Sequence, residues 1–84
     1  MKFLFKVMNA GYMPTGDRYY LDVRVESGTV EVGDVGIVED MTNCKISIRS
    51  VGIASGSGAK GLIPLTIDPP SIEISELQGR IVTG

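Results

Sequence analysis

The chain contains no histidine, no tryptophan and a single cysteine among its 84 residues. A Ser-His-Asp triad, a Cys-His pair and a Cys/His zinc site need residues that are missing, and one cysteine cannot form a disulfide within the chain. The acidic residues fall in predicted turns or on solvated faces, where no burial tunes them for general acid catalysis. We therefore expect a protein that is not an enzyme and that holds no metal or cofactor.

Neither an excess of positive charge nor a long apolar run is present. Eight lysines and arginines stand against ten aspartates and glutamates, a net charge of −2, whereas autonomous nucleic-acid binders usually carry a basic footprint. The apolar run 3–5, between Lys2 and Lys6, is too short for a signal-peptide core, and no stretch approaches the roughly 20 apolar residues of a membrane span. We expect no charge-driven nucleic-acid binding and no membrane association. The lone Cys44 suits a reducing compartment, so a cytoplasmic location is expected.

Alternation of apolar and polar side chains with a period of two is the main pattern that is present, and it is typical of half-buried strands. It is clearest over residues 18–26, where Tyr19, Leu21, Val23 and Val25 share one face. The same pattern predicts strands at 3–8, from Val35 onward, at 44–49, at 63–68 and at 80–83.

Turn residues separate these runs, and no interval is long enough for an ordinary helix. Ser27-Gly28 and Gly33-Asp34 are turn signals. Val35 and Ile37 are the predicted apolar side chains of the next strand. Pro64 removes a ladder donor, which indicates a sheet edge or a bulge.

Six short strands, each with one apolar face, cannot bury those faces in a flat sheet without exposing two edges. Closure into a small barrel solves both problems. We therefore predict an all-β fold, a small closed six-stranded antiparallel β-barrel that occupies residues 1–84 as a single domain.

One segment resembles a known family. Thr15-Gly16 is followed, after seven residues, by the sequence RVESGTVEVGD over 24–34. This spacing resembles the second domain of translational GTPases such as elongation factor Tu, and residues 45–51, 59–61 and 67–82 are similar to later parts of that domain. The resemblance implies a Greek-key barrel like domain 2 of a translation factor. It also implies that Gly16, Gly28, Gly33 and Asp34 are fold-determining turn residues, with Asp34 bonding nearby amides. Between Gly28 and Gly33, the resemblance implies that Val30 and Val32 tuck under the end of the barrel.

The resemblance does not extend to the family's ligand sites. The chain has no Gly-x-x-x-x-Gly-Lys-Ser/Thr loop, so no nucleotide binding is expected. Of the residues that hold the aminoacyl end of tRNA in elongation factor Tu, only the aromatic is matched, at Tyr12. The acidic pair falls on Asn9 and Ala10, and the threonine falls on Asp22.

A Gly-x-Gly-x-x-Gly pattern occurs at residues 56–61. It signals a dinucleotide site only between a strand and a helix, and here a predicted strand follows it. We interpret it as a hairpin loop with Lys60 solvated at its tip.

Two surface features are candidates for partner contact. The outward face of the 18–26 strand carries Arg18, Tyr20 and Arg24, a combination that can stack a base and neutralise phosphate; a mixed-charge solvated face is the alternative. Lys45 and Arg49 extend this basic strip if the two faces adjoin.

The second feature is the apolar run Tyr12-Met13-Pro14, in a predicted loop between strands. It is either a partner surface or a flap over the barrel mouth. Cys44 is interpreted as a small core side chain, because no histidine or helix terminus is predicted beside it to activate a thiol.

Two functional hypotheses follow. The first is a stand-alone, non-catalytic binding module that docks to a protein or ribonucleoprotein partner. The alternative is a structural or homo-oligomeric accessory barrel with no ligand of its own.

Overall fold

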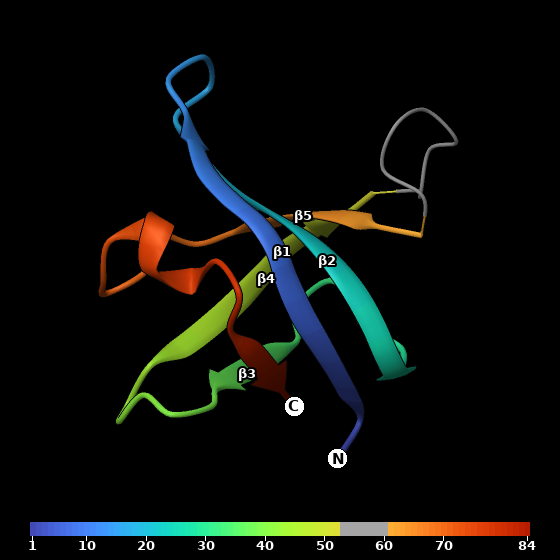
Figure 1. Ribbon diagram of the computed structural model, residues 1–84. Coiled ribbons are helices and arrows are strands. Elements are labelled where there is room, and N and C mark those ends of the chain that lie inside the picture. The colour runs from blue at the N-terminus through green and yellow to red at the C-terminus, as the bar shows by residue number, and fades with distance from the viewer. Residues whose placement is uncertain (53–60) are drawn as a thin grey trace.

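The computed structural model describes residues 1–52 and 61–84, and it is built of strands that close on themselves (Figure 1). The elements are β1 (Phe3–Met13), β2 (Arg18–Gly28), β3 (Val35–Val38), β4 (Lys45–Val51), β5 (Ile63–Ile67), the short 3₁₀ helix η1 (Ile74–Leu77) and β6 (Ile81–Thr83). Among the described residues, no helix is long and apolar enough to cross a membrane.

The strands form a closed antiparallel barrel in the order β1-β2-β5-β4-β3-β6. β1 closes it by pairing with β2 on one side and with β6 on the other. The two ends of the chain therefore meet, and the Gly84 amide donates to the carbonyl oxygen of Phe3 at 3.0 Å. The predicted all-β class and six-stranded closed barrel are confirmed.

The core is a single apolar cluster inside the barrel. Residues from every strand contribute to it, together with Val30 before β3, Cys44 before β4 and Leu77 of η1. Its buried members are Phe3, Phe5, Val7, Leu21, Val23, Val30, Val38, Cys44, Ile46, Ile48, Leu65, Ile67, Leu77 and Val82. The alternation in the sequence thus predicted most of the buried faces, and Cys44 is a core side chain.

β1 extends to Met13, beyond the predicted end at residue 8. The prediction stops early because a bulge reverses the alternation of inward and outward side chains. Val7 pairs with Val23 and Asn9 pairs with Asp22, so Met8 is an extra residue in the ladder. Before the bulge the odd-numbered residues face inward, and beyond it the even-numbered residues do. The period-two pattern in the sequence therefore stops at residue 8. β1 and β2 continue as a long hairpin that extends beyond the barrel (Figure 1).

The apolar side chains of β3 point the opposite way from the prediction. Val35 and Ile37 are 49% and 53% exposed, while Gly36 and Val38 face the core. A Cβ at Gly36 would overlap Cγ1 of Val82, so this tightly packed position requires glycine. Because a glycine contributes nothing to an apolar pattern, the sequence indicated the wrong face.

The loop before β3 also differs in part from the prediction. Val30 is 7% exposed and tucks under the barrel as expected, but Val32 is 66% exposed. Val32 lies in the turn between Glu31 and Asp34, whose backbone amide donates to the carbonyl of Glu31 at 3.1 Å, and this turn keeps it outside the barrel.

Pro64 lies neither at an edge nor in a bulge. β5 pairs with β2 and with β4, and Pro64 lies opposite Asp22. The irregularity is in the neighbouring strand, where Ile48 pairs with Ile67 and Ser50 with Thr66, which leaves Arg49 as the extra residue.

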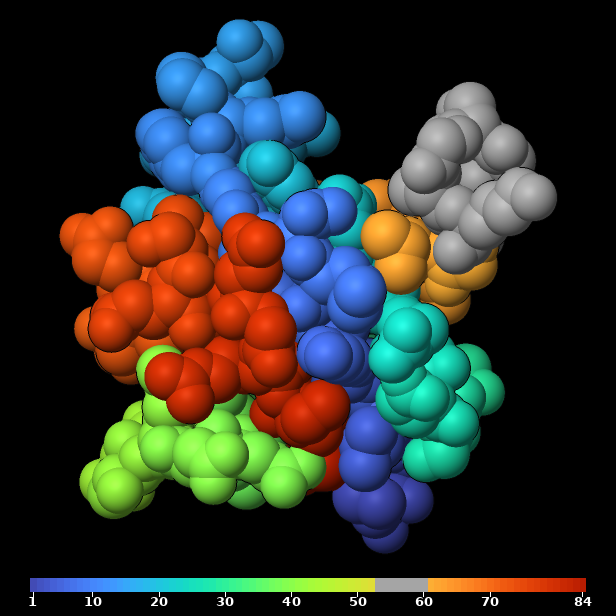
Figure 2. All heavy atoms as spheres, viewed as in Figure 1, coloured from blue at the N-terminus to red at the C-terminus, as the bar shows by residue number. Residues whose placement is uncertain are grey.

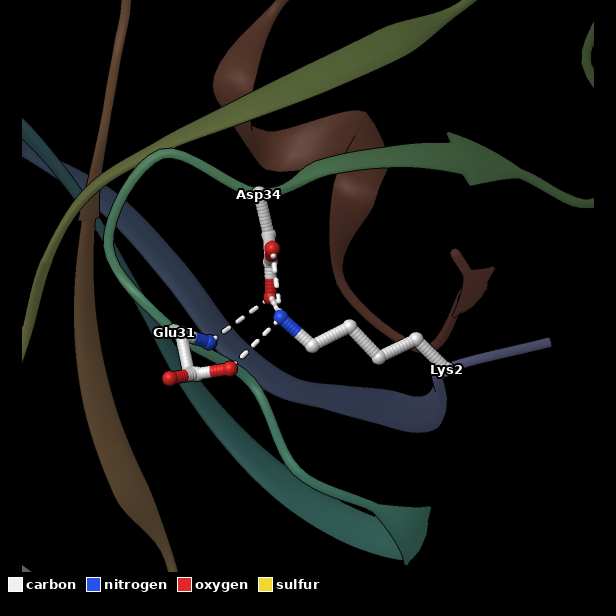
Figure 3. A network of polar contacts seen from close by, with 3 residues as sticks. All are labelled: Lys2, Glu31 and Asp34. Atoms are coloured by element: carbon white, nitrogen blue, oxygen red, sulfur yellow. Dashed lines mark hydrogen bonds and ion pairs between the residues drawn. The ribbon is translucent and has the colours of Figure 1, made fainter.

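A polar network ties the start of β1 to the turn before β3 (Figure 3). Asp34 accepts the backbone amide of Glu31 at 2.8 Å, as expected for a turn residue. The Lys2 ammonium donates to both carboxylate oxygens of Asp34 at 2.9 and 3.0 Å and pairs with Glu31 at 2.7 Å. The hydrogen bond from Lys2, followed by that from the Glu31 amide, holds the pKa of Asp34 below its ordinary value of 3.8.

Two glycines with positive φ provide a matched test of the turn geometry. Gly28 has a φ of +75° and Gly33 a φ of +92°. Alanine at Gly33 meets nothing within 4 Å, so it should cost only the left-handed strain of about 1–2 kcal/mol. Alanine at Gly28 would in addition overlap the carbonyl oxygen of Lys2, so Gly28→Ala should be the more damaging change by a clear margin. Urea unfolding followed by circular dichroism measures both, and equal stability of the two variants would contradict the close approach.

The Lys2–Asp34 pair predicts a pH-dependent stability. Because the folded protein lowers the pKa of Asp34, the stabilisation is present above the unfolded value and is lost as pH falls through the folded one. Asp34→Asn keeps an acceptor for the Glu31 amide but loses the charge. The variant should melt at a lower temperature than the wild type near neutral pH, and this difference should shrink from about pH 5 to about pH 2. Asp40→Asn, in an exposed turn, is the control; a constant difference between Asp34→Asn and the wild type across that range would refute the assignment.

Candidate functional site

A hollow next to the predicted contact residues lies on the outer face of β2, β5 and β4. It has a volume of about 450 Å³ and is bordered by Arg18, Tyr20 and Asp22 of β2, with Met13 at the end of β1. Its floor and far side come from β5 and the end of β4, and consist of Ser50, Gly52, Pro64, Leu65 and Thr66. A second hollow of about 450 Å³ adjoins it, lined by Gly16, Asp17, Arg18, Arg49, Ser50 and Thr66. We call these two connected hollows, which share Arg18, Ser50 and Thr66, the outer groove.

Cross-strand register explains why these side chains meet. Tyr20 lies opposite Thr66, and Thr66 lies opposite Ser50 on the other side of β5. One row of side chains therefore crosses three strands, and the bulge at Arg49 lies directly before Ser50 in that row. The strand pattern predicted the outward face of β2 but contained no signal that β5 would lie between β2 and β4.

Tyr20 is held in place by the strand beside it. It lies opposite Gly11 of β1, and a Cβ at Gly11 would come within 2.5 Å of the Tyr20 hydroxyl oxygen. The ring thus covers a position that only glycine leaves open. An aromatic side chain packed in this way loses little further freedom on binding a partner.

Charges of both signs border the outer groove. Arg49 pairs with Asp68 at 3.3 Å, and both side chains remain more than half exposed. Arg18 lies at the junction of the two hollows, its side chain folded near Gly16, and Asp17 and Asp22 are on the rim. Two arginines and two aspartates on the rim leave the groove close to neutral, with apolar surface between them.

The structure divides the predicted basic strip. Arg18, Tyr20 and Arg49 border the outer groove, but Arg24 and Lys45 do not. Arg24 lies six residues, or about 20 Å, further along β2 than Arg18, beyond the last residue that pairs with β5. There its Nε bonds Glu26 at 2.6 Å.

Lys45 lies at the other end of β4 from the groove. It pairs with Ile37 of β3 and is four residues, or about 13 Å, from Arg49. The five side chains therefore do not all border the outer groove, because distance along β2 and β4 separates Arg24 and Lys45 from it.

The apolar run Tyr12-Met13-Pro14 is also divided. Tyr12 and Met13 belong to β1 rather than to a loop, and only Pro14 lies in the turn. Successive residues of a strand point to opposite faces, so Met13 borders the outer groove while Tyr12 packs against Tyr19 on the inner face of the hairpin. Both are well exposed, at 43% and 50%, and they do not form one patch.

The glycine-rich pattern at 56–61 and its Lys60 lie outside the described residues, apart from Gly61, which has a φ of +76°. The predicted turn residue Gly16 also has positive φ, at +84°, and allows the hairpin to reverse beside the groove. Sequence reasoning missed Ser50, Thr66 and Pro64 as groove residues, because small side chains on separate strands carry no motif.

Comparison with known proteins identifies no relative. No family model matches the chain, and neither the curated proteins nor the solved structures contain a match.

Proposed function

We propose that this chain is a non-catalytic β-barrel binding module of the cytoplasm that docks to a protein or ribonucleoprotein partner through the outer groove. The observation that carries this proposal is the grouping of Arg18, Tyr20 and Met13 around one hollow on an otherwise solvated sheet face.

The composition of the groove supports docking. Tyrosine, arginine and methionine are enriched at interfaces, and tyrosine and arginine dominate binding hot spots. Tyr20 is already packed over Gly11, and Arg18 lies at the junction of the two hollows. A partner that covers the groove would bury Met13 and the apolar surface of Pro64 while leaving the charges at the rim.

The balance of charge favours a protein surface over bare nucleic acid. Binding driven by phosphate needs several unneutralised cations, but Asp17 and Asp22 border the same groove and Asp68 pairs with Arg49. A partner with its own mixed charges fits this rim better. In a ribonucleoprotein partner, we expect the protein component to occupy the groove.

The resemblance to domain 2 of translational GTPases gives further support to the docking role. Residues 15–34, which carry that resemblance, begin with the turn of the hairpin and include all of β2. If the chain is a relative of that domain, it uses a sheet face to meet its partner.

An accessory barrel that associates with itself is the second candidate. It is favoured by the exposed apolar side chains of Val32, Val35 and Ile37, which lie in β3 and the turn before it. This surface is remote in sequence from the outer groove, so the two candidates are separable by mutation.

The outer groove is tested by charge reversal of its two arginines. Arg18→Glu with Arg49→Glu should abolish capture of a stoichiometric partner from host lysate, because both changes lie in the groove. Arg24→Glu with Lys45→Glu, which has the same change in net charge, should retain that partner. Affinity capture at two salt concentrations, with mass spectrometry and RNA sequencing of the bound material, measures both.

Three outcomes are informative. Equal loss of the partner in both variants would show that overall charge, not the groove, controls binding. RNA that disappears at the higher salt without any loss of protein would assign the contact to phosphate attraction. Recovery of only self-associated chain from the wild type would favour the accessory barrel.

A further inference from the structure

The inner face of the β1–β2 hairpin forms a further hollow, distinct from the two that make up the outer groove. It has a volume of about 460 Å³ and is lined by Tyr12 and Tyr19 from the hairpin and by residues 71–74 from the segment before and at the start of η1. Figure 2 shows that segment, in orange, directly beneath the blue hairpin. We call this hollow the tyrosine hollow.

Two tyrosine rings form one wall of the tyrosine hollow. Tyr12 and Tyr19 are cross-strand partners whose ring centroids are 4.9 Å apart, with the planes tilted by 49°. Both rings line the hollow, so a side chain that enters it meets aromatic surface. The opposite wall is partly apolar, because Ile72 and Ile74 pack against the core.

The charge of the tyrosine hollow is negative only. Glu73 is exposed on its rim, and among the described residues none of the side chains that line it is cationic. Asp17, in the turn of the hairpin, accepts a hydrogen bond from the Tyr12 hydroxyl. That hydrogen bond raises the pKa of Tyr12, so the phenol stays neutral.

Aromatic faces combined with a carboxylate are the chemistry that binds organic cations. A guanidinium or ammonium group over a tyrosine ring is attracted by the ring quadrupole, and a nearby carboxylate adds a charge-assisted hydrogen bond. Guanidinium is the better fit, because its plane stacks on a ring while its edge donates to the carboxylate.

We propose that the tyrosine hollow binds an arginine side chain presented by an exposed basic segment of a protein partner. The guanidinium stacks against Tyr12 and Tyr19 and pairs with Glu73, while the apolar stem of the arginine packs on Ile72. The proposal does not depend on the outer groove, which lies on the other face of the hairpin.

The test is a titration of the ¹⁵N-labelled chain with the peptide acetyl-Gly-Ser-Arg-Ser-Gly-amide. A second peptide carries citrulline in place of arginine. Citrulline has the same shape as arginine but no charge. The arginine peptide should shift the amide signals of Tyr12, Tyr19 and Glu73 with a dissociation constant on the order of millimolar. The citrulline peptide should bind at least about fivefold more weakly, since it lacks both the cation–π attraction and the ion pair.

Variants separate the tyrosine hollow from general electrostatics. Glu73→Gln should weaken binding of the arginine peptide by about two- to fivefold and leave binding of the citrulline peptide unchanged. Glu76→Gln removes the same charge three residues away in η1 and should leave both unchanged. Tyr12→Leu should weaken binding of the arginine peptide. The amide signals of residues away from the substitution should keep their wild-type positions, as expected for an intact barrel.

Equal affinity for the two peptides, or equal effects of Glu73→Gln and Glu76→Gln, would overturn the proposal. Signal changes centred on Arg18, Tyr20 and Arg49 would also overturn it, because they would place the peptide in the outer groove. The Arg18→Glu, Arg49→Glu chain should bind the arginine peptide as the wild type does, so failure of the proposed docking function and failure of this proposal give different results.

Discussion

The pairing of β1 with two neighbours is the constraint on which the rest of the structure depends. Because β1 bonds to β2 along one edge and to β6 along the other, the sheet has no free edge and its apolar faces point inward. A sheet this small curls shut only if some strands bend sharply. The extra residues Met8, Glu26 and Arg49 supply that bending, each at a register shift between paired strands.

Closure also determines where binding surfaces can form. β1 and β2 are longer than the other strands, so their hairpin continues past the barrel and exposes both of its faces. The outer face continues across β5 to β4 and carries the outer groove, with a near-neutral mixture of arginines and aspartates. The inner face meets residues 71–74 and carries the tyrosine hollow, whose only rim charge among the described residues is acidic. One hairpin thus carries two surfaces of different chemistry.

The sequence predicts the parts of this fold that depend on alternation and turn chemistry. The strand at residues 18–26 is predicted correctly because the alternation there is uninterrupted. The turn role of Asp34 is predicted correctly because its hydrogen bond to the Glu31 amide is local. The inner face of β3 is missed because Gly36 faces the core, where packing against Val82 and Phe3 leaves no room for a side chain. Only some of the residues that line the outer groove are predicted, since which residues line it depends on which strands are neighbours. That arrangement is a property of closure rather than of any one segment.

The most direct test of the account is whether β1 and β6 are paired in solution. Phe3 and Gly84 exchange both backbone hydrogen bonds, so the adjacent pair Leu4 and Thr83 is a non-hydrogen-bonded pair, with Cα atoms about 4.5 Å apart. A two-dimensional NOE spectrum should therefore show a strong contact between the α-protons of Leu4 and Thr83, and another between those of Lys6 and Ile81. If these contacts are absent while those between β1 and β2 are present, the sheet is open and the account of the barrel and both of its surfaces is wrong.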